Sequence, residues 1–248
     1  ALLGEPYAGG WRKPWRRFAI AFGLDPNISY RDWALWVLQK VMSPIKPVIV
    51  AGGTVKEEVH VGEDVNLFEF PWPYLHEGDG GRYTDLCVIT VKHPTTDWVN
   101  WSNYRVQIYD KRRCIMNFTP GQQTADIFYR EYEAKGNNMP ANICHAEPSL
   151  NAAAAFPLPP FVNECDLAGA FRGSPVELTK AETNEVPVPA DAELIIEVEV
   201  LKGTRVPEGP FGEFIGYIHA THPRPLARVL AITHRKDPII PFTVEGVK

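Results

Sequence analysis

The sequence Leu194-Ile195-Ile196-Glu197-Val198-Glu199-Val200 alternates well, with four apolar residues at its even-numbered positions. Successive side chains of a β-strand point to opposite faces of the sheet, so a period of two predicts a strand. We expect the even-numbered side chains to face the core, and Glu197 and Glu199 to face outward. This strand is the best-defined element of the sequence, and it decides the fold class.

Shorter runs with strand character lie on both sides of it. They predict strands at residues 48–50, 55–61, 86–91, 142–145, 176–179 and 229–233. Helices are predicted at 28–42, where Ser29 can cap, and at 117–136, where Thr119 and Gln122 resemble a capping box. The pattern predicts an α+β fold with a mostly antiparallel sheet or barrel, and no domain boundary is evident after about residue 45.

Composition narrows the class of protein. The chain has 248 residues, 45% of them hydrophobic, and a net charge of -5, which is typical of a folded soluble protein. It contains no apolar run long enough to span a membrane and no signal-peptide pattern, so we expect no membrane partner. Mild acidity argues against nucleic-acid binding, although Trp11–Arg17 interleaves four positive charges with two indoles.

Cysteine usage and the chain ends add two expectations. Cys87, Cys114, Cys144 and Cys165 have no CxxC spacing, which favours buried thiols in a reducing cytoplasm. The chain does not begin with Met, and it stops soon after the strand-like run 239–242. We therefore interpret it as part of something longer.

A glycine-rich segment at residues 207–217 contains the most unusual pair of acids. Glu208 and Glu213 would point to opposite faces of a regular strand, but Gly209, Pro210 and Gly212 break the ladder between them. A bent loop could turn both carboxylates into one pocket, where two different environments would make one an acid and the other a base. The alternative is a surface turn with two solvated acids.

Other polar segments give weaker signals. Residues 98–105 place amides and hydroxyls among aromatics beside Arg105, which suits either an oriented ligand or a half-buried strand edge. Four alanines within 149–156 predict either a tightly packed helix or a place where a ligand lies against backbone. The turn at residues 78–82 is glycine-rich but lacks the spacing of a nucleotide loop.

Taken together, these segments resemble the UbiD family of decarboxylases, which use prenylated FMN to remove carboxylate from aromatic and α,β-unsaturated acids. The resemblance rests on five segments in the family's order, with family-like spacing: residues 78–83, 100–105, 156–159, 173–178 and 208–213. It implies a split β-barrel like that of flavin reductases over residues 46–248, preceded by a partial N-terminal α/β segment at 1–45. A family member is usually much longer, so the resemblance implies that the beginning of the N-terminal domain and all of the C-terminal domain lie outside this sequence.

The resemblance also implies roles for individual residues. Arg105, Glu208 and Glu213 match the catalytic trio: Arg105 would pair with Glu208, and Glu213 would protonate the carbon that loses carbon dioxide. A divalent metal, Mn or Mg, would be held by Asn100, Glu164 and the position of Gln123, where the family has a histidine; a potassium ion is a further candidate cofactor. The predicted cofactor-binding residues are Asn100, Ser102, Asn103, Tyr104, Arg105, Gln122, Gln123, Ala154, Ala155, Phe156 and Glu164.

Three functions follow as hypotheses. The first is a cytoplasmic, prenylated-FMN-dependent and reversible decarboxylase of an aromatic or unsaturated acid, working as a homo-oligomer or with a second chain that carries the C-terminal domain. The second is a non-catalytic or cofactor-poor subunit of a multi-chain carboxylase, which Gln123 and the short length suggest. The third is a flavin oxidoreductase on the same barrel, which would have no evident use for the acid pair.

Overall fold

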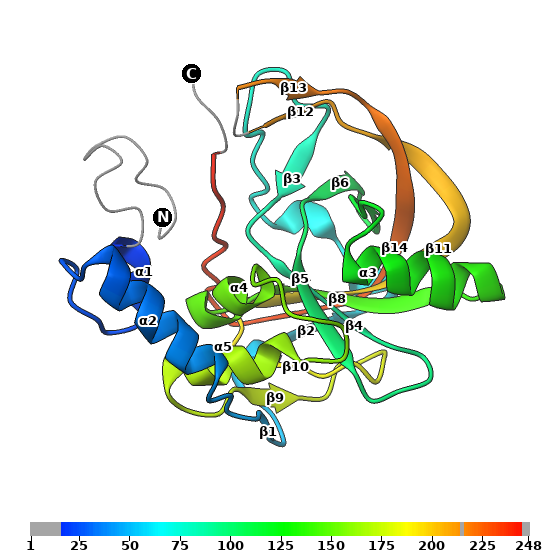
Figure 1. The fold of residues 1–248 in the computed structure, drawn as a ribbon. Helices are drawn as coiled ribbons and strands as arrows, with labels where there is room; N and C mark the ends of the chain where they lie inside the picture. The colour runs from blue at the N-terminus through cyan, green and yellow to red at the C-terminus, as the bar shows by residue number, and fades with distance from the viewer. Residues whose placement is uncertain (1–15, 214–215, 245–248) are drawn as a thin grey trace.

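Strands dominate the computed structural model, which describes residues 16–213 and 216–244 (Figure 1). The helices are α1 (Arg16–Ala21), α2 (Tyr30–Val41), α3 (Gln123–Asp126), α4 (Pro148–Ala154) and α5 (Glu164–Arg172). The strands are β1 (Val48–Ile49), β2 (Glu58–Val61), β3 (Arg82–Thr84), β4 (Val88–Lys92), β5 (Val99–Asn103), β6 (Val106–Asp110), β7 (Arg113–Met116), β8 (Met139–His145), β9 (Glu177–Thr179), β10 (Val188–Pro189), β11 (Leu194–Glu208), β12 (Phe211–Gly212), β13 (Ile218–His219) and β14 (His222–His234).

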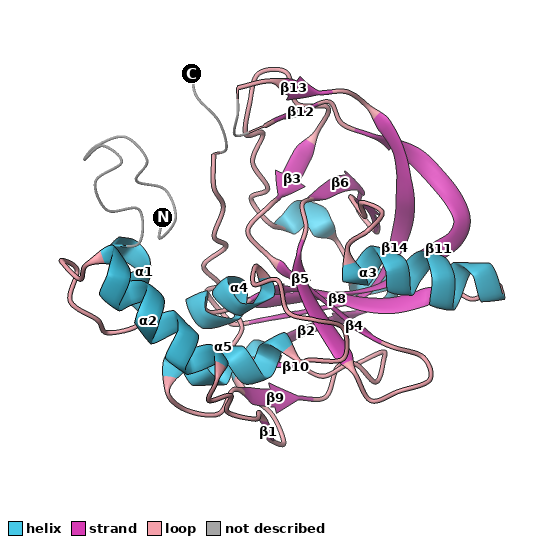
Figure 2. Cartoon of the chain, viewed as in Figure 1, coloured by secondary structure: helices cyan, strands magenta, loops and turns pink. Residues whose placement is uncertain are grey.

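One large sheet organises the molecule. Its order is β3-β6-β7-β14-β11-β8-β4-β5, with β2 paired to β14, and every pairing in it is antiparallel. The sheet curls into a half-barrel, and α1, α2, α4 and α5 lie together beside it (Figure 2). A small sheet, β1-β9-β10, and the hairpin β12-β13 complete the described strands. The predicted α+β fold with a mostly antiparallel sheet is confirmed.

The central strand runs beyond its predicted end. Leu194, Ile196, Val198 and Val200 all lie in the larger core cluster, as their alternation predicts, while Ile195 lies in the second cluster on the other side. The pairing of β11 with β14 shifts register between Val200 and Arg205 and then resumes until Glu208 pairs with His222. The bent extension delivers Glu208 to the end of the sheet remote from residue 194.

The prediction for Glu197 is wrong. Its side chain is fully buried, and its carboxylate accepts hydrogen bonds from the backbone N–H groups of Glu182 and Thr183, at 2.7 Å each, and from the Thr183 hydroxyl. Glu199, two residues along the same face, is partly exposed and pairs with Arg228 at 2.7 Å. A loop distant in sequence covers one glutamate and leaves the other at the surface.

The helices match the predictions unevenly. Ser29 caps α2 by accepting from the Asp32 N–H at 3.1 Å, as expected. The capping box at Thr119 is wrong, since α3 begins at Gln123 without a side-chain cap. This helix continues as a π-helical turn (Ile127–Tyr132) and a 3-10 turn (Glu133–Lys135), and Gly136 ends it at φ 75° as predicted. Helix α5 was not predicted.

The N-terminal helices pack on the second core cluster. Trp36 of α2 and Phe22 stack on Phe171 of α5, with ring centroids 5.7 and 5.3 Å apart.

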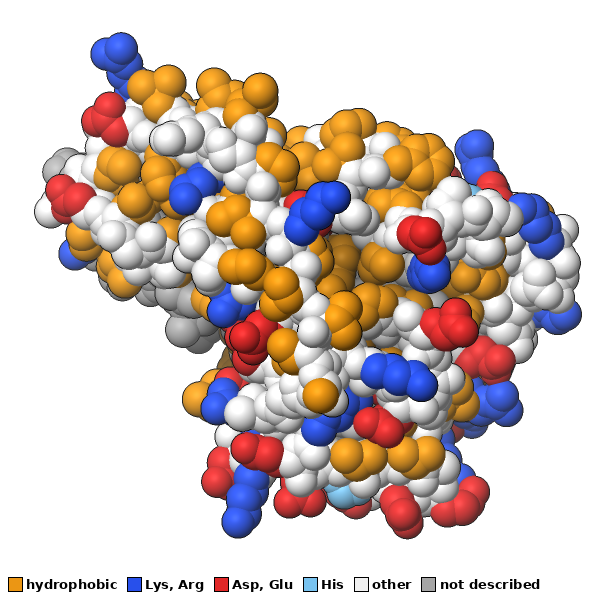
Figure 3. Space-filling view, turned by 90° about the horizontal axis from the view of Figure 1, so that it is seen from below, with side chains coloured by type: hydrophobic (Ala, Val, Ile, Leu, Met, Phe, Trp, Pro, Cys, Tyr) orange, Lys and Arg blue, Asp and Glu red, His pale blue; other side chains and the backbone are white. Residues whose placement is uncertain are grey.

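Hydrophobic side chains are spread over much of the face seen from below (Figure 3). The exposed apolar residues of α2, its C-cap and β1 include Leu35, Leu38, Met42, Val48 and Ile49. The division at residue 45 stays a prediction.

Three smaller expectations have different outcomes. All four cysteines are free and buried, as predicted. Among the described residues, no helix is long and apolar enough to cross a membrane. The basic stretch Trp11–Arg17 lies almost entirely outside the described residues.

Replacing Glu197 by alanine should destabilise the fold far more than the same change at Glu199. The Glu197→Ala variant removes a fully buried carboxylate that accepts three hydrogen bonds from residues 182–183, and we expect a loss of about 3 kcal/mol in the free energy of unfolding. Glu199→Ala removes a partly exposed ion pair, and its loss should stay below about 1 kcal/mol. Urea unfolding followed by tryptophan fluorescence measures both, and equal losses would contradict the burial described here.

Candidate active site

Three charged side chains from distant parts of the chain meet at one end of the sheet. The Arg105 guanidinium donates from Nε to Glu208 Oε1 at 2.9 Å and from Nη2 to Glu208 Oε2 at 3.1 Å. Its third nitrogen, Nη1, donates to Glu213 Oε1 at 2.6 Å. The structure therefore brings the predicted trio together, with one carboxylate held by two bonds and the other by one.

Burial distinguishes the two carboxylates. The Glu208 side chain is fully buried and that of Arg105 is 9% exposed, whereas Glu213 retains 24% exposure. Burial lowers the pKa of Arg105, but hydrogen bonds and charge from Glu208 and Glu213 outweigh it, so the pKa is raised above its ordinary value. A guanidinium with this pKa stays charged, and it holds the Glu208 carboxyl group by two parallel bonds. Glu213 is the carboxyl group that an outside molecule can reach.

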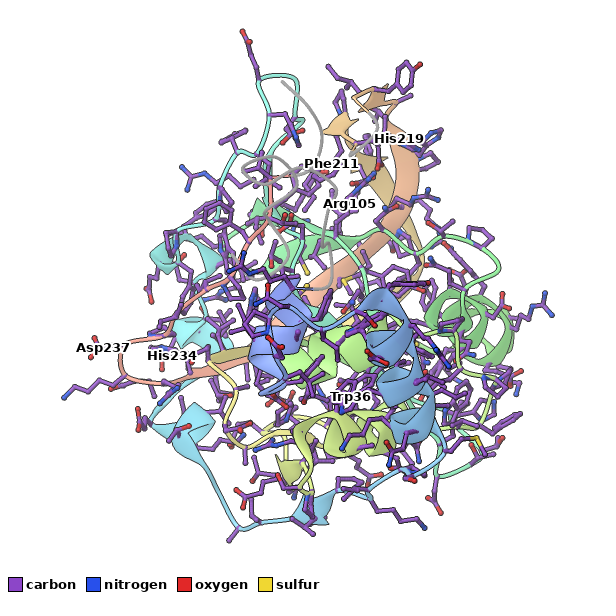
Figure 4. All side chains as sticks on the ribbon, turned by 60° about the vertical axis from the view of Figure 1, so that its left-hand side comes forward. Trp36, Arg105, Phe211, His219, His234 and Asp237 are labelled. Carbon is purple, nitrogen blue, oxygen red and sulfur yellow. The ribbon has the colours of Figure 1, made fainter. Side chains whose placement is uncertain are left out.

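Aromatic rings line the protein side of the trio. The Phe211 ring lies under the Arg105 guanidinium, 4.3 Å from its carbon to the ring centroid, and Figure 4 shows the two side by side. Tyr83 packs edge-on against Phe211 at 4.6 Å, and both side chains are fully buried. Burial, reinforced by the negative charge of Glu208, raises the pKa of Tyr83 far above its usual range. Water is excluded from this side, which strengthens each ionic contact.

The elements explain how the trio forms. Arg105 lies in the two-residue connection between β5 and β6, Glu208 ends β11, and Glu213 directly follows β12. Two side chains that the sequence analysis did not single out, Asp79 and Gln107, bond to the backbone between the glutamates. The glycine-rich turn at 78–82 was the available signal for Asp79, and its contact is with protein backbone.

A second polar cluster contains the three predicted metal ligands. Asn100 Nδ2 donates to Gln123 Oε1 at 2.9 Å and to Glu164 Oε1 at 3.0 Å. Asn100 Oδ1 accepts from the hydroxyls of Ser102 and Thr124 at 2.9 and 2.6 Å. Burial raises the pKa of Glu164 to about 7, although hydrogen bonds from Trp101 and Asn100 act against the shift.

The donor set of this cluster is all oxygen. Gln123 Oε1 and Glu164 Oε1 both converge on Asn100 Nδ2, so a hard cation such as Mg²⁺ or Mn²⁺ would take the place of that nitrogen, and Asn100 would have to turn its oxygen toward the cation. Among the described residues, no three His, Cys, Asp or Glu side chains are grouped closely enough to hold a metal. A metal at this cluster would therefore depend on the amide oxygens of Asn100 and Gln123.

A cavity of about 600 Å³ opens beside β5, among α1, α2, α4 and α5. Of the predicted cofactor residues it is lined by Asn103, Ala155 and Phe156, and its other walls are mainly apolar, with the aromatic rings of Phe18, Phe22, Trp33 and Phe171 among them. Asn103 Oδ1 and Asn151 Oδ1 are buried without a hydrogen-bond partner, and both residues line it. A flat apolar ring system that carries N–H donors would satisfy these acceptors, so the residues fit a flavin.

The remaining predicted cofactor residues lie around these three places. Ser102 belongs to the polar cluster, Gln122 is exposed just before α3, and Ala154 packs against the second core cluster. Tyr104 is buried in the larger core, edge-on to Phe118 at 5.2 Å, and does not line the cavity. Among the described residues that line this cavity, none belongs to the trio.

Removing only the cation of the trio should be costly to stability. Arg105→Met leaves Glu208 buried without its partner, and we expect a loss of about 3–5 kcal/mol in the free energy of unfolding at pH 7. The double variant Arg105→Met/Glu208→Gln should recover most of that loss, because no buried charge remains. Urea unfolding of the two variants tests this; a double variant no more stable than the single one would refute the pairing.

Comparison with known proteins identifies the family. The family model described as "UbiD: 3-octaprenyl-4-hydroxybenzoate carboxy-lyase Rift-related domain" matches residues 47–248. Pyrrole-2-carboxylic acid decarboxylase of Pseudomonas aeruginosa is 37% identical over 93% of this chain and 47% of its own length. Phenolic acid decarboxylase of Bacillus subtilis is 35% identical over 94% of this chain and 50% of its own length.

Solved structures agree on the fold. Vanillic acid decarboxylase of Sedimentibacter hydroxybenzoicus superposes with a TM-score of 0.90 at 28% identity, over 94% of this chain and 51% of that one. The UbiD-class enzyme HmfF from Pelotomaculum thermopropionicum, in complex with FMN, gives 0.87 at 29%, over 93% and 51%. The predicted split-barrel, flavin-binding fold is confirmed. The chain spans about half the length of the curated relatives it matches, and it belongs to the UbiD family.

Proposed function

We propose that this chain is the proton-transferring and cofactor-binding part of a prenylated-FMN-dependent decarboxylase that acts on an aromatic or α,β-unsaturated acid. The observation that supports this proposal most strongly is the Arg105 guanidinium, which is paired with a fully buried Glu208 and a partly exposed Glu213. The relatives named above as decarboxylases of aromatic acids support the same reaction class. The reaction is reversible in principle, with carboxylation as its reverse.

Each member of the trio has a distinct role in this proposal. Glu208 fixes the guanidinium plane through two parallel bonds, so that Arg105 presents a permanent positive charge toward the region of the substrate carboxylate. Glu213 delivers a proton to the carbon from which carbon dioxide departs, and is reprotonated from solvent through its exposed edge. The Phe211 and Tyr83 rings keep water from the other side of the charges.

The cofactor and metal are assigned to the neighbouring places. When bound, prenylated FMN supplies the electron sink for loss of carbon dioxide. Asn103, Ala155 and Phe156 would contact its ring system, and a divalent cation held by Asn100, Gln123 and Glu164 would neutralise its phosphate. Potassium is a further candidate cofactor for an oxygen-lined position. A cytoplasmic location of the protein is also part of this proposal.

A subunit without its own catalysis is the second candidate. Gln123 favours it, because a neutral amide replaces the imidazole that the family uses at this position and weakens any metal site. The structural relative from Sedimentibacter hydroxybenzoicus is a two-chain assembly, and an evolved form of HmfF is dimeric. Native mass spectrometry of protein from cells that make prenylated FMN separates the candidates: bound cofactor supports the enzyme, and a cofactor-free chain supports the subunit.

Replacing Glu213 by glutamine should stop turnover without emptying the cofactor site. An amide of nearly the same shape cannot donate the acidic proton, so we expect kcat to fall at least about 100-fold. Flavin absorbance per chain should stay unchanged. Glu199→Gln, a partly exposed glutamate of the same sheet, is the matched control and should keep full activity; full activity of Glu213→Gln would exclude its proposed role.

The oxygen cluster predicts weak, carboxylate-dependent metal binding. Isothermal titration with Mn²⁺ should give a measurable affinity that Glu164→Gln abolishes, because the site then lacks its only anionic ligand. Gln123→His should tighten binding at least about tenfold by adding an imidazole ligand. Unchanged Mn²⁺ affinity in both variants would show that the metal does not bind at this cluster.

A further inference from the structure

The glycine-rich turn before β3 contacts the segment that carries the two catalytic glutamates. The Asp79 side chain is fully buried, and its Oδ2 accepts from the N–H groups of Leu75 and His76 at 3.1 and 2.8 Å. Its Oδ1 accepts from the N–H of Gly212 at 2.9 Å. One carboxylate thus joins two segments that lie more than a hundred residues apart in sequence.

A second side chain holds the other end of the same loop. Gln107 of β6 accepts from the Gly209 N–H at 3.0 Å and donates to the Gly80 carbonyl at 3.1 Å. The Gly80 N–H donates to the Pro210 carbonyl at 2.7 Å. A Cβ at Gly80 would lie 2.0 Å from the Gly209 carbonyl oxygen, so only glycine permits this approach.

The two glutamates are held with different redundancy. Glu208 ends a long strand, is paired with His222, and receives two bonds from Arg105. Glu213 follows a two-residue strand that pairs only with β13 in the described residues, and it receives one bond from Arg105. In the described part of the chain, the backbone of Glu213 itself bonds only within its hairpin, to Tyr217 at 2.7 Å and Gly216 at 2.9 Å. The hydrogen bond from the Gly212 N–H to Asp79 is the neighbouring backbone contact that ties this hairpin to a distant segment of the chain.

We propose that Asp79 is a positioning residue for Glu213, acting through the Gly212 amide, and that Gln107 serves the Glu208 side through Gly209. This inference rests on the proposed proton-donating role of Glu213. Asp79 touches no substrate or cofactor in it. Because it sets where the proton donor stands, its loss should slow the chemical step and leave substrate binding nearly unchanged.

The test compares Asp79→Asn with a matched control in the full-length protein carrying prenylated FMN. Asparagine keeps the size of the side chain. Its amide nitrogen, however, must face one of the backbone N–H groups from which Asp79 now accepts a hydrogen bond. Asp110→Asn is the control, because Asp110 also accepts from a backbone N–H, that of Arg112 at 2.9 Å, at the far end of β6. Hydrogen–deuterium exchange of the peptide 209–213 reports loop order independently of activity.

We expect Asp79→Asn to raise exchange of that peptide at least about fivefold and to lower kcat at least about tenfold, with KM within twofold of wild type. Asp110→Asn should change none of these, and Asp79→Glu should restore part of the protection because it keeps a carboxylate. If Asp79→Asn fails to fold, Gln107→Met provides the same two readouts from the other end of the loop.

The outcomes separate this inference from the proposed function. Faster exchange of peptide 209–213 in Asp79→Asn with unchanged kcat would overturn the positioning role. Unchanged exchange would show that the hydrogen bond from Gly212 to Asp79 does not order the loop. A fall in kcat accompanied by an equal rise in KM would also contradict it, since substrate binding would then be affected. If wild type decarboxylates no acid, the proposed function fails, and the exchange measurement still decides whether Asp79 orders the loop.

Discussion

The ion pair between Arg105 and Glu208 is the constraint on which the rest of the site depends. A fully buried carboxylate is tolerated only with a partner, and the two parallel bonds from the guanidinium provide it. The bent extension of β11 and the tight β5–β6 connection bring these two residues together. The third guanidinium nitrogen then remains for Glu213, whose exposure makes it the group that chemistry can use.

Strand β5 connects the three parts of the proposed site. Asn100 belongs to the oxygen cluster, Asn103 to the cavity, and Arg105, two residues beyond the strand, to the trio. A cofactor with a phosphate at one end and a reactive ring at the other needs such a row of unlike environments. The sheet fixes their spacing, while the loops on either side supply the variable chemistry.

Local patterns predicted the parts of the fold whose partners are local or repeated. The alternation of residues 194–200 sufficed for β11, and Ser29 sufficed for the start of α2. The burial of Glu197 could not be predicted, because residues 182–183 cover it from another part of the chain. Helix α5 was missed because Gly169, which the close approach of Ile45 requires, interrupts its helical pattern. The glycines between Glu208 and Glu213 suggested that these two acids could share a pocket, whereas Arg105 was assigned to them by family resemblance, since no local rule joins residues 105 and 208.

The most direct test of the central claim is decarboxylation in D₂O by the full-length protein with prenylated FMN bound. A panel of aromatic and α,β-unsaturated acids would be supplied, with released carbon dioxide and product deuterium both measured. We expect carbon dioxide from at least one acid, and one deuterium on the carbon that carried the carboxylate. A cofactor-loaded protein that releases carbon dioxide from none of them would contradict it.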